Sequence, residues 1–269
     1  MEFEQALSLH QVQVAAANGG EPILLLHGLF GSGDNLGGVA RALAAAGMRP
    51  VLIDLRNHGR SPWAADMTLD AMAADVALLQ DQLGCAGCAV LGHSLGGKVA
   101  MQLALNEPQR VGALVVADVA PVAYTPHHQA IFAALAGVDL AQLQSRQQAE
   151  REMAALVPES SVRLFLLKSL YRDKDGEGEH WRWRFNREAL QAGYPSMIAA
   201  LHGGPYAGPT LFIRGGLSDY VLPEHAATMR ALFPHYRLET IEGTGHWLHG
   251  EKPAEFNRLA VEFLVAANS

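Results

Sequence analysis

The stretch that decides the fold of this chain reads Cys88-Ala89-Val90-Leu91-Gly92-His93-Ser94-Leu95-Gly96-Gly97-Lys98. A short apolar strand runs directly into the pattern Gly-x-Ser-x-Gly, and apolar residues at helical spacing follow it. This order is typical of a sharp strand-to-helix turn that presents a serine, because glycines on either side remove Cβ atoms that would clash. We therefore expect Ser94 at the start of a helix, where the helix dipole and free N–H groups favour negative charge.

The size of the chain suits one large domain or two small ones, and it is sufficient to bury a substantial single core. It has 269 residues, of which 49% are hydrophobic and 17% charged, and a formal net charge of −7. No run of basic residues occurs, so nucleic acid and anionic membrane surfaces are poor partner candidates. The first residues are acidic rather than basic, and no apolar run approaches the ~18 residues of a membrane span. We therefore expect no membrane insertion and a cytoplasmic location, with the oligomeric state left open.

Outward from Ser94, apolar runs alternate with helical patterns. Continuous apolar runs at 22–26, 50–54 and 111–117 suit strands that are covered on both faces, and Thr68 is expected to cap a helix that ends near Leu83. Such alternation predicts an α/β fold with a mostly parallel central sheet and helices on both faces.

The alternation is interrupted between residues 121 and 208. This segment holds helical stretches, a charged loop at 172–179 and an aromatic cluster at 181–185, but no strong strand. We predict a single domain, 1–269, with 121–208 inserted after the strand that follows Ser94, as a helical cap over the carboxyl ends of the strands.

A serine becomes a strong nucleophile only when a base accepts its proton and an acid orients that base. His246 is the candidate base, since it lies in a glycine-flanked loop, Gly243-Thr244-Gly245-His246-Trp247, after the last expected strand. His27 and His93 are expected to hold neighbouring loops through hydrogen bonds, and His249 to lie beside the base.

Two carboxylates compete for the role of the acid. Asp219 follows the next-to-last strand, which is the usual position in this arrangement, whereas Asp118 follows the strand after the serine turn. Both strand ends face the same crevice, so position alone leaves the choice open.

The negative charge that forms during acyl transfer requires two backbone donors. We expect one from the N–H of Leu95 and the other from the loop after the first buried strand, at Leu29 with Phe30 beside it. A phosphate-binding loop is the competing interpretation of residues 28–38, but the Gly-Lys-[Ser/Thr] ending is missing. The C-x-x-C pair Cys85 and Cys88 lacks the second pair that a zinc site requires, and we interpret both as small residues that lead into a strand.

Several motifs in one order resemble the α/β-hydrolase superfamily, and more narrowly the YbfF-type bacterial esterases and their mitochondrial abhydrolase relatives. The motifs of the superfamily are His27-Gly28-x-x-Gly31, Asp54-x-Arg56-Asn57-His58-Gly59-x-Ser61, Gly92-His93-Ser94-Leu95-Gly96-Gly97-Lys98 and Gly245-His246-Trp247. The motifs of the narrower group are Leu29-Phe30-Gly31-Ser32, Asp34-Asn35-Leu36, Arg56-Asn57-His58-Gly59, Ala120-Pro121 and Trp183-Arg184-Phe185-Asn186. The resemblance implies carboxylic ester hydrolysis, thioesters included, of a small-molecule substrate, with no metal and no organic cofactor. It also favours Asp118 as the acid, although this chain departs from the family pattern in carrying Asp219.

The cap is expected to determine the substrate. Phe165, Trp181 and Trp183 are candidate residues of an apolar acyl pocket. No cluster of Lys and Arg in the sequence marks a site for a phosphorylated leaving group, and Lys98 is expected to make a structural contact. The alternatives to an esterase are a lactonase, a carbon–carbon bond hydrolase or a lyase with the same catalytic residues, and a catalytically idle ligand-binding protein.

Overall fold

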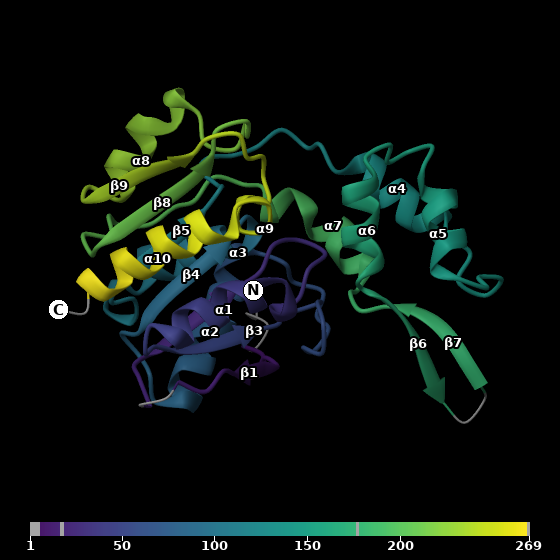
Figure 1. Ribbon diagram of the computed structural model, residues 1–269, viewed down its shortest axis with the longest axis horizontal. Coiled ribbons are helices and arrows are strands. Elements are labelled where there is room, and N and C mark those ends of the chain that lie inside the picture. Colours follow the sequence, from purple (N-terminus) through teal and green to yellow (C-terminus); the bar gives the residue numbers. More distant parts are fainter. Residues whose placement is uncertain (1–5, 17–18, 176–177, 268–269) are drawn as a thin grey trace.

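A seven-stranded sheet forms the centre of the molecule. The computed structural model describes residues 6–16, 19–175 and 178–267, and within them the strand order is β1-β3-β2-β4-β5-β8-β9 (Figure 1). The strands are β1 (Gln11–Gln13), β2 (Pro22–Leu26), β3 (Arg49–Ile53), β4 (Ala89–His93), β5 (Leu114–Ala117), β8 (Thr210–Gly215) and β9 (Tyr236–Ile241). Only the edge pair β1 and β3 is antiparallel within this described sheet, so the prediction of a mostly parallel sheet is confirmed.

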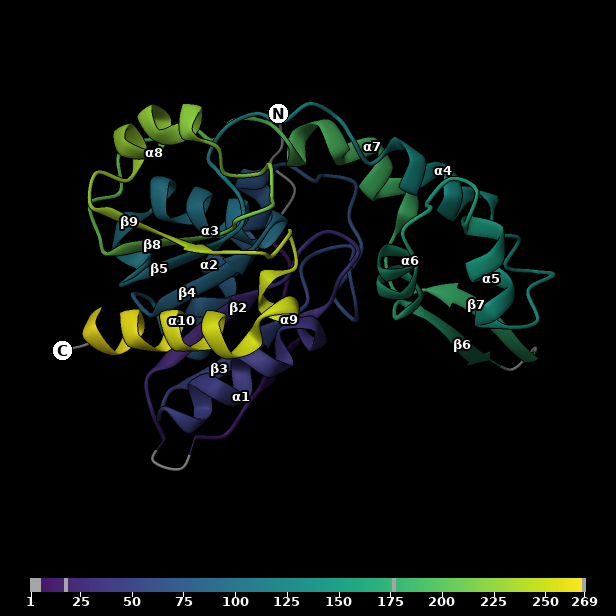
Figure 2. The same ribbon diagram turned by 45° about the horizontal axis from the view of Figure 1, so that its top comes forward.

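Helices cover both faces of the sheet because the strand side chains alternate between two apolar cores. Leu24, Leu26 and Val90 point into one core, whereas Leu25 and Leu91 point into the other. Figure 2 shows α1, α9 and α10 along one face and α2, α3 and α8 along the other. The bounds of these helices are α1 (Gly37–Ala45), α2 (Leu69–Leu83), α3 (Leu95–Asn106), α8 (Ala226–Leu232), α9 (Leu248–Glu251) and α10 (Pro253–Ala267). Thr68 caps α2 through its side chain, as predicted.

The inserted segment forms a separate lobe beside the carboxyl ends of the strands (Figure 1). Its helices are α4 (Gln129–Gly137), α5 (Arg146–Met153), α6 (Ser160–Leu167) and α7 (Arg187–Met197). Lys98 joins the two lobes, since its ammonium group donates hydrogen bonds to the carbonyl oxygens of Val122, at 2.9 Å, and of Ala199. Burial lowers the pKa of Lys98 to about 7. This is the structural contact that the sequence predicted for Lys98.

The expectation of a lobe with helices and a charged loop but no strong strand is wrong. An antiparallel hairpin of β6 (Leu170–Asp175) and β7 (Gly178–Trp183) occupies the expected charged loop and part of the aromatic cluster. Opposite charges face each other across the two strands. The Glu179 carboxylate forms ion pairs with the Arg172 guanidinium, at 3.0 Å, and with the Lys174 ammonium group, at 2.7 Å. The alternation Trp-Arg-Trp-Arg-Phe at 181–185 has the period of two that a strand requires, and this signal was available in the sequence.

Candidate active site

Ser94 lies at a strained turn between β4 and α3. Its φ and ψ angles are 54° and −117°, in a region that residues with a side chain rarely adopt. The two flanking glycines are required for space: a Cβ on Gly92 would lie 2.2 Å from the oxygen of Gly96, and one on Gly96 would lie 2.2 Å from the oxygen of Leu26. The turn therefore exposes the Ser94 hydroxyl at the carboxyl end of the sheet, as the sequence predicts.

Loops after three different strands bring the serine, a histidine and a carboxylate into one line. His246, in the loop after β9, places Nε2 at 2.9 Å from Oγ of Ser94. Its other ring nitrogen, Nδ1, lies 2.7 Å from Oδ2 of Asp118, which directly follows β5. Both distances are those of hydrogen bonds, so a proton can pass from the hydroxyl to an imidazole that the carboxylate orients.

The structure brings Asp118, and not Asp219, to the histidine. Asp118 is fully buried, and its Oδ1 also accepts a hydrogen bond of 2.8 Å from the backbone N–H of Gly215. The hydroxyl of Ser218 donates to Oδ2 of Asp118. Asp219 follows Ser218 on the same loop, but its side chain is exposed to solvent. Sequence reasoning assigned no role to Ser218, although its place in the loop after β8 was a usable signal.

His246 packs against two other rings and is held through its backbone. The Tyr220 ring stacks on the imidazole with centroids 4.0 Å apart, and the His93 ring lies 4.8 Å away. Nε2 of His93 donates to the carbonyl oxygen of His246 at 2.9 Å. Burial, followed by the charges of His249 and His246, lowers the pKa of His93 well below its usual value. Burial likewise lowers the pKa of His249 to about 4. His93 thus holds the base loop as a neutral imidazole, in the structural role that was predicted for it.

The expected backbone donors, Leu29 and Leu95, both lie near Ser94. Leu95 begins α3, and Leu29 lies with Ser94 and Leu95 around a small cavity. The N–H of Phe30 instead donates to Nε2 of His58 at 3.2 Å. Phe30 is therefore unsuited as a donor to substrate, whereas the N–H of Leu29 has no acceptor among the described residues.

Two buried histidines fix this loop. Nδ1 of His58 bonds the carbonyl oxygen of Arg56 at 2.8 Å, which leaves Nε2 as the acceptor for Phe30. Nε2 of His27 accepts from the N–H of Leu55 at 3.0 Å. Burial lowers the pKa of His27 and lowers that of His58 to about 3, so both rings are neutral at pH 7. The His27 contact agrees with its predicted structural role.

A pocket of about 1080 Å³ opens onto Ser94 and His246 between the two lobes. The cap contributes the apolar side chains Ile131, Val162, Leu164 and Phe165 to its wall, while Leu36, Val39 and Trp247 come from the body. Phe165 thus lies where a substrate-binding residue was predicted.

Trp181 and Trp183 do not belong to the wall of this pocket within the described structure. Trp183 is buried and stacks on Phe185, at a centroid distance of 5.4 Å and an angle of 14°. The Arg172 guanidinium packs over the Trp181 ring. Both rings pack against other side chains of the cap, on the strand that pairs with β6, so their prediction as contacts of this pocket is corrected.

No helix among the described residues is long and apolar enough to cross a membrane. In the same part of the chain, no three His, Cys, Asp or Glu side chains are arranged so that they could hold a metal ion.

The fold and the site together define the class of this protein. The family model described as alpha/beta hydrolase fold matches residues 21–253, and the chain belongs to that family. It is 40% identical over 244 residues to Escherichia coli K12 esterase YbfF, with 90% of this chain and 92% of the relative covered. It is 39% identical over 251 residues to the mouse sn-1-specific diacylglycerol lipase ABHD11, with 90% of this chain and 80% of that relative covered. A solved marine microorganism esterase superposes with a TM-score of 0.91 at 35% identity, covering 96% of this chain and all of that one.

Proposed function

We propose that this protein is a serine carboxylic ester hydrolase that works through an acyl-enzyme. The line from Ser94 Oγ through His246 to buried Asp118, with bonds of 2.9 and 2.7 Å, is the observation that carries the proposal. Relatives named as esterase and as diacylglycerol lipase support the same chemistry.

In the proposed reaction, His246 accepts the Ser94 proton as Oγ bonds to the carbonyl carbon of the ester. The N–H groups of Leu29 and Leu95 stabilise the oxyanion. His246 then gives its proton to the leaving oxygen, or to sulfur in a thioester, as that bond breaks. His246 next accepts a proton from a water molecule as the water oxygen bonds to the acyl carbon. The bond from that carbon to Ser94 Oγ then breaks, the acid is released, and His246 returns the proton to Oγ. Asp118 remains ionised and stabilises the imidazolium that forms in each half.

A fluorophosphonate tests the proposal, because it reacts with an activated serine. We expect one adduct per chain, located by mass spectrometry in the peptide that contains Ser94, and concurrent loss of hydrolysis of p-nitrophenyl butyrate. Ser94→Ala should neither label nor turn over while keeping its circular dichroism spectrum. Labelling at another residue, or an active Ser94→Ala protein, would exclude the proposal. Measuring acyl thioesters and lactones on the same preparation separates the esterase from the other reactions that these residues could support.

A further inference from the structure

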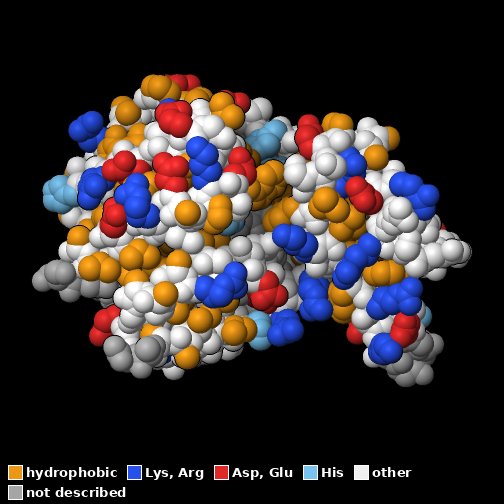
Figure 3. Space-filling model, viewed as in Figure 1, with side chains coloured by type: hydrophobic (Ala, Val, Ile, Leu, Met, Phe, Trp, Pro, Cys, Tyr) orange, Lys and Arg blue, Asp and Glu red, His pale blue; other side chains and the backbone are white. Residues whose placement is uncertain are grey.

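A second cavity, of about 370 Å³, lies at the junction of the two lobes next to the active-site pocket. Four cations line it: Arg60 of the body, and Arg146, Lys168 and Arg184 of the cap. Asp34 and Asp54 are the acidic side chains in the same wall. The wall is therefore positive by about two charges at pH 7, on a protein whose net charge is −7. Figure 3 shows Lys and Arg side chains gathered along this junction.

The four cations do not neutralise carboxylates elsewhere in the described structure, where none of them forms an ion pair. Arg146 donates from Nε and one terminal nitrogen to the carbonyl oxygen of Leu170, at 3.1 and 2.7 Å. The Arg184 guanidinium packs over the Tyr171 ring, 4.3 Å from its centroid. These contacts hold two guanidinium groups in place and leave N–H donors available.

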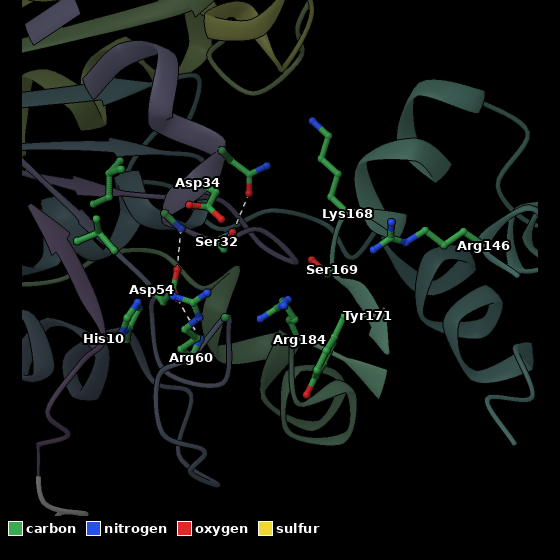
Figure 4. A pocket seen from close by; sticks show the side chains of 15 residues that line it. His10, Ser32, Asp34, Asp54, Arg60, Arg146, Lys168, Ser169, Tyr171 and Arg184 are labelled. Carbon is green, nitrogen blue, oxygen red and sulfur yellow. Dashed lines mark hydrogen bonds between the residues drawn. The ribbon is translucent and has the colours of Figure 1, made fainter. Parts of the chain in front are cut away.

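Of the two acids, Asp54 uses its carboxylate within the body. The Asp54 carboxylate is directed into its own loop, where it accepts the backbone N–H of Gly33 at 2.7 Å and that of Arg60 at 2.9 Å. Figure 4 shows Arg146 and Arg184 reaching from the cap toward Arg60 and Asp54 of the body, across an open space. Fixed guanidinium groups that surround a space bind phosphate well, because their planar donors match its oxygens.

This cavity adjoins the reaction site. Asn35 and Lys168 line both it and the pocket that contains Ser94. Ser169, in its wall, donates a hydrogen bond of 2.9 Å to the carbonyl oxygen of Phe30, which follows the expected oxyanion donor Leu29. The larger pocket is apolar on its cap side and suits an acyl chain, so the polar cavity is left for the other part of an ester.

We infer that the cavity bounded by Arg60, Arg146, Lys168 and Arg184 is a binding site for a phosphate monoester group, carried by the leaving group of the substrate. This inference extends the proposed function by naming a class of substrate. The same donors would also bind free inorganic phosphate. Two experiments distinguish a phosphate carried by the substrate from free phosphate.

The first experiment compares two esters that differ only in the phosphate, 1-butyrylglycerol and 1-butyrylglycerol 3-phosphate, at fixed ionic strength. We expect kcat/KM to be at least about 10-fold higher for the phosphorylated ester. Arg60→Gln and Lys168→Gln, which change exposed side chains, should each remove most of this preference. Arg151→Gln is the matched control, since Arg151 lies on α5 with Arg146 but outside the cavity. Equal kcat/KM for the two esters excludes the substrate as the source of the phosphate.

The second experiment needs no turnover. Inorganic phosphate is titrated into the Ser94→Ala protein by calorimetry, and into the same protein with Arg60→Gln, Lys168→Gln or Arg151→Gln added. We expect binding at one site that the first two substitutions weaken at least about 10-fold and the third leaves unchanged.

The two experiments are interpreted together. Binding of inorganic phosphate without a kcat/KM preference between the two esters would assign the site to free phosphate. The inference would be overturned if inorganic phosphate did not bind and the phosphorylated ester were not preferred. It would also be overturned if Arg151→Gln weakened phosphate binding or the preference as much as Arg60→Gln and Lys168→Gln do. Failure to hydrolyse any ester would contradict the proposed function, while the titration would still test the cavity.

Discussion

At the scale of single residues, the position of the proposed acid, Asp118, is the main departure from the usual arrangement. Asp118 has a φ of 51°, so the backbone directly after β5 is itself strained. This conformation accompanies a carboxylate that reaches His246, the N–H of Gly215 and the hydroxyl of Ser218 together. Position in the sequence could not decide between Asp118 and Asp219, because both follow strands that end at the same edge.

Replacing the acid should separate the two candidates. We expect Asp118→Asn to lower kcat by about 10³ to 10⁴, because the amide cannot stabilise the His246 imidazolium. Asp219→Asn should change kcat less than about 2-fold, since its side chain is exposed and away from the ring. Steady-state kinetics with p-nitrophenyl butyrate, on proteins with unchanged thermal unfolding, measures both. A large loss in Asp219→Asn alone would transfer the role to that residue.

Ser218 should act through Asp118. Its hydroxyl is one of three donors to that carboxylate. We expect Ser218→Ala to lower kcat about 10-fold, with a smaller effect on KM, because a hydrogen bond to a charged acceptor is lost. The loss should vanish when Asp118 is already Asn, and a double-mutant cycle measures this coupling. Additive effects of the two substitutions would mean that Ser218 acts independently of the carboxylate.

At the scale of elements, the body could be predicted because its strands are buried on both faces and are continuous apolar runs. Residues 22–26 and 89–93 are examples, and each leads to a loop of the site. The cap hairpin was missed because half of its strand residues are charged, so cross-strand partners rather than a continuous apolar run define its strands. Trp181 and Trp183 were assigned to substrate because the pairing that directs their rings is not visible in a single strand.

The two tryptophans should differ in their effects on stability. Trp183→Ala removes a buried ring that stacks on Phe185 and should lower the free energy of unfolding by about 3 to 5 kcal/mol. Trp181→Ala removes a half-buried ring and should cost about 1 kcal/mol. Urea unfolding measures both, and KM for a short ester should remain within about 2-fold in Trp181→Ala. A large rise in KM with unchanged stability would restore Trp181 as a substrate contact.

At the scale of the whole molecule, both cavities form where the body meets the cap. The cations of the smaller one come from four distant segments, at 60, 146, 168 and 184. The sequence showed no cluster of Lys and Arg here, because the fold of the cap brings Arg146, Lys168 and Arg184 together and the position of the cap on the body adds Arg60. The four cationic residues can be read from the sequence, but their proximity in space cannot be predicted from one sequence alone.

The buried histidines should make the folded protein sensitive to acid. The pKa of His249 falls from 6.5 to about 4 on folding, chiefly through burial. Between these values the unfolded chain binds a proton that the folded protein does not, so the free energy of unfolding decreases as pH falls. At pH 5 the expected loss from this one residue is about 2 kcal/mol. The pKa values of His27, His58, His93 and His128 are lowered in the same direction.

His249→Gln tests this linkage, because glutamine cannot take up the proton. Urea unfolding of wild type and variant at pH 8 gives the packing cost of the substitution, since the histidine is neutral in both states there. As pH falls from 8 to 5, we expect the stability difference to move in favour of His249→Gln by about 2 kcal/mol. His27, His58 and His128 are present in both proteins and cancel from the comparison, whereas burial, the larger cause of the lowered pKa of His93, acts in both proteins and the smaller effect of the His249 charge is lost in the variant. Stability curves that stay parallel over this range would show that protonation of His249 is not linked to unfolding.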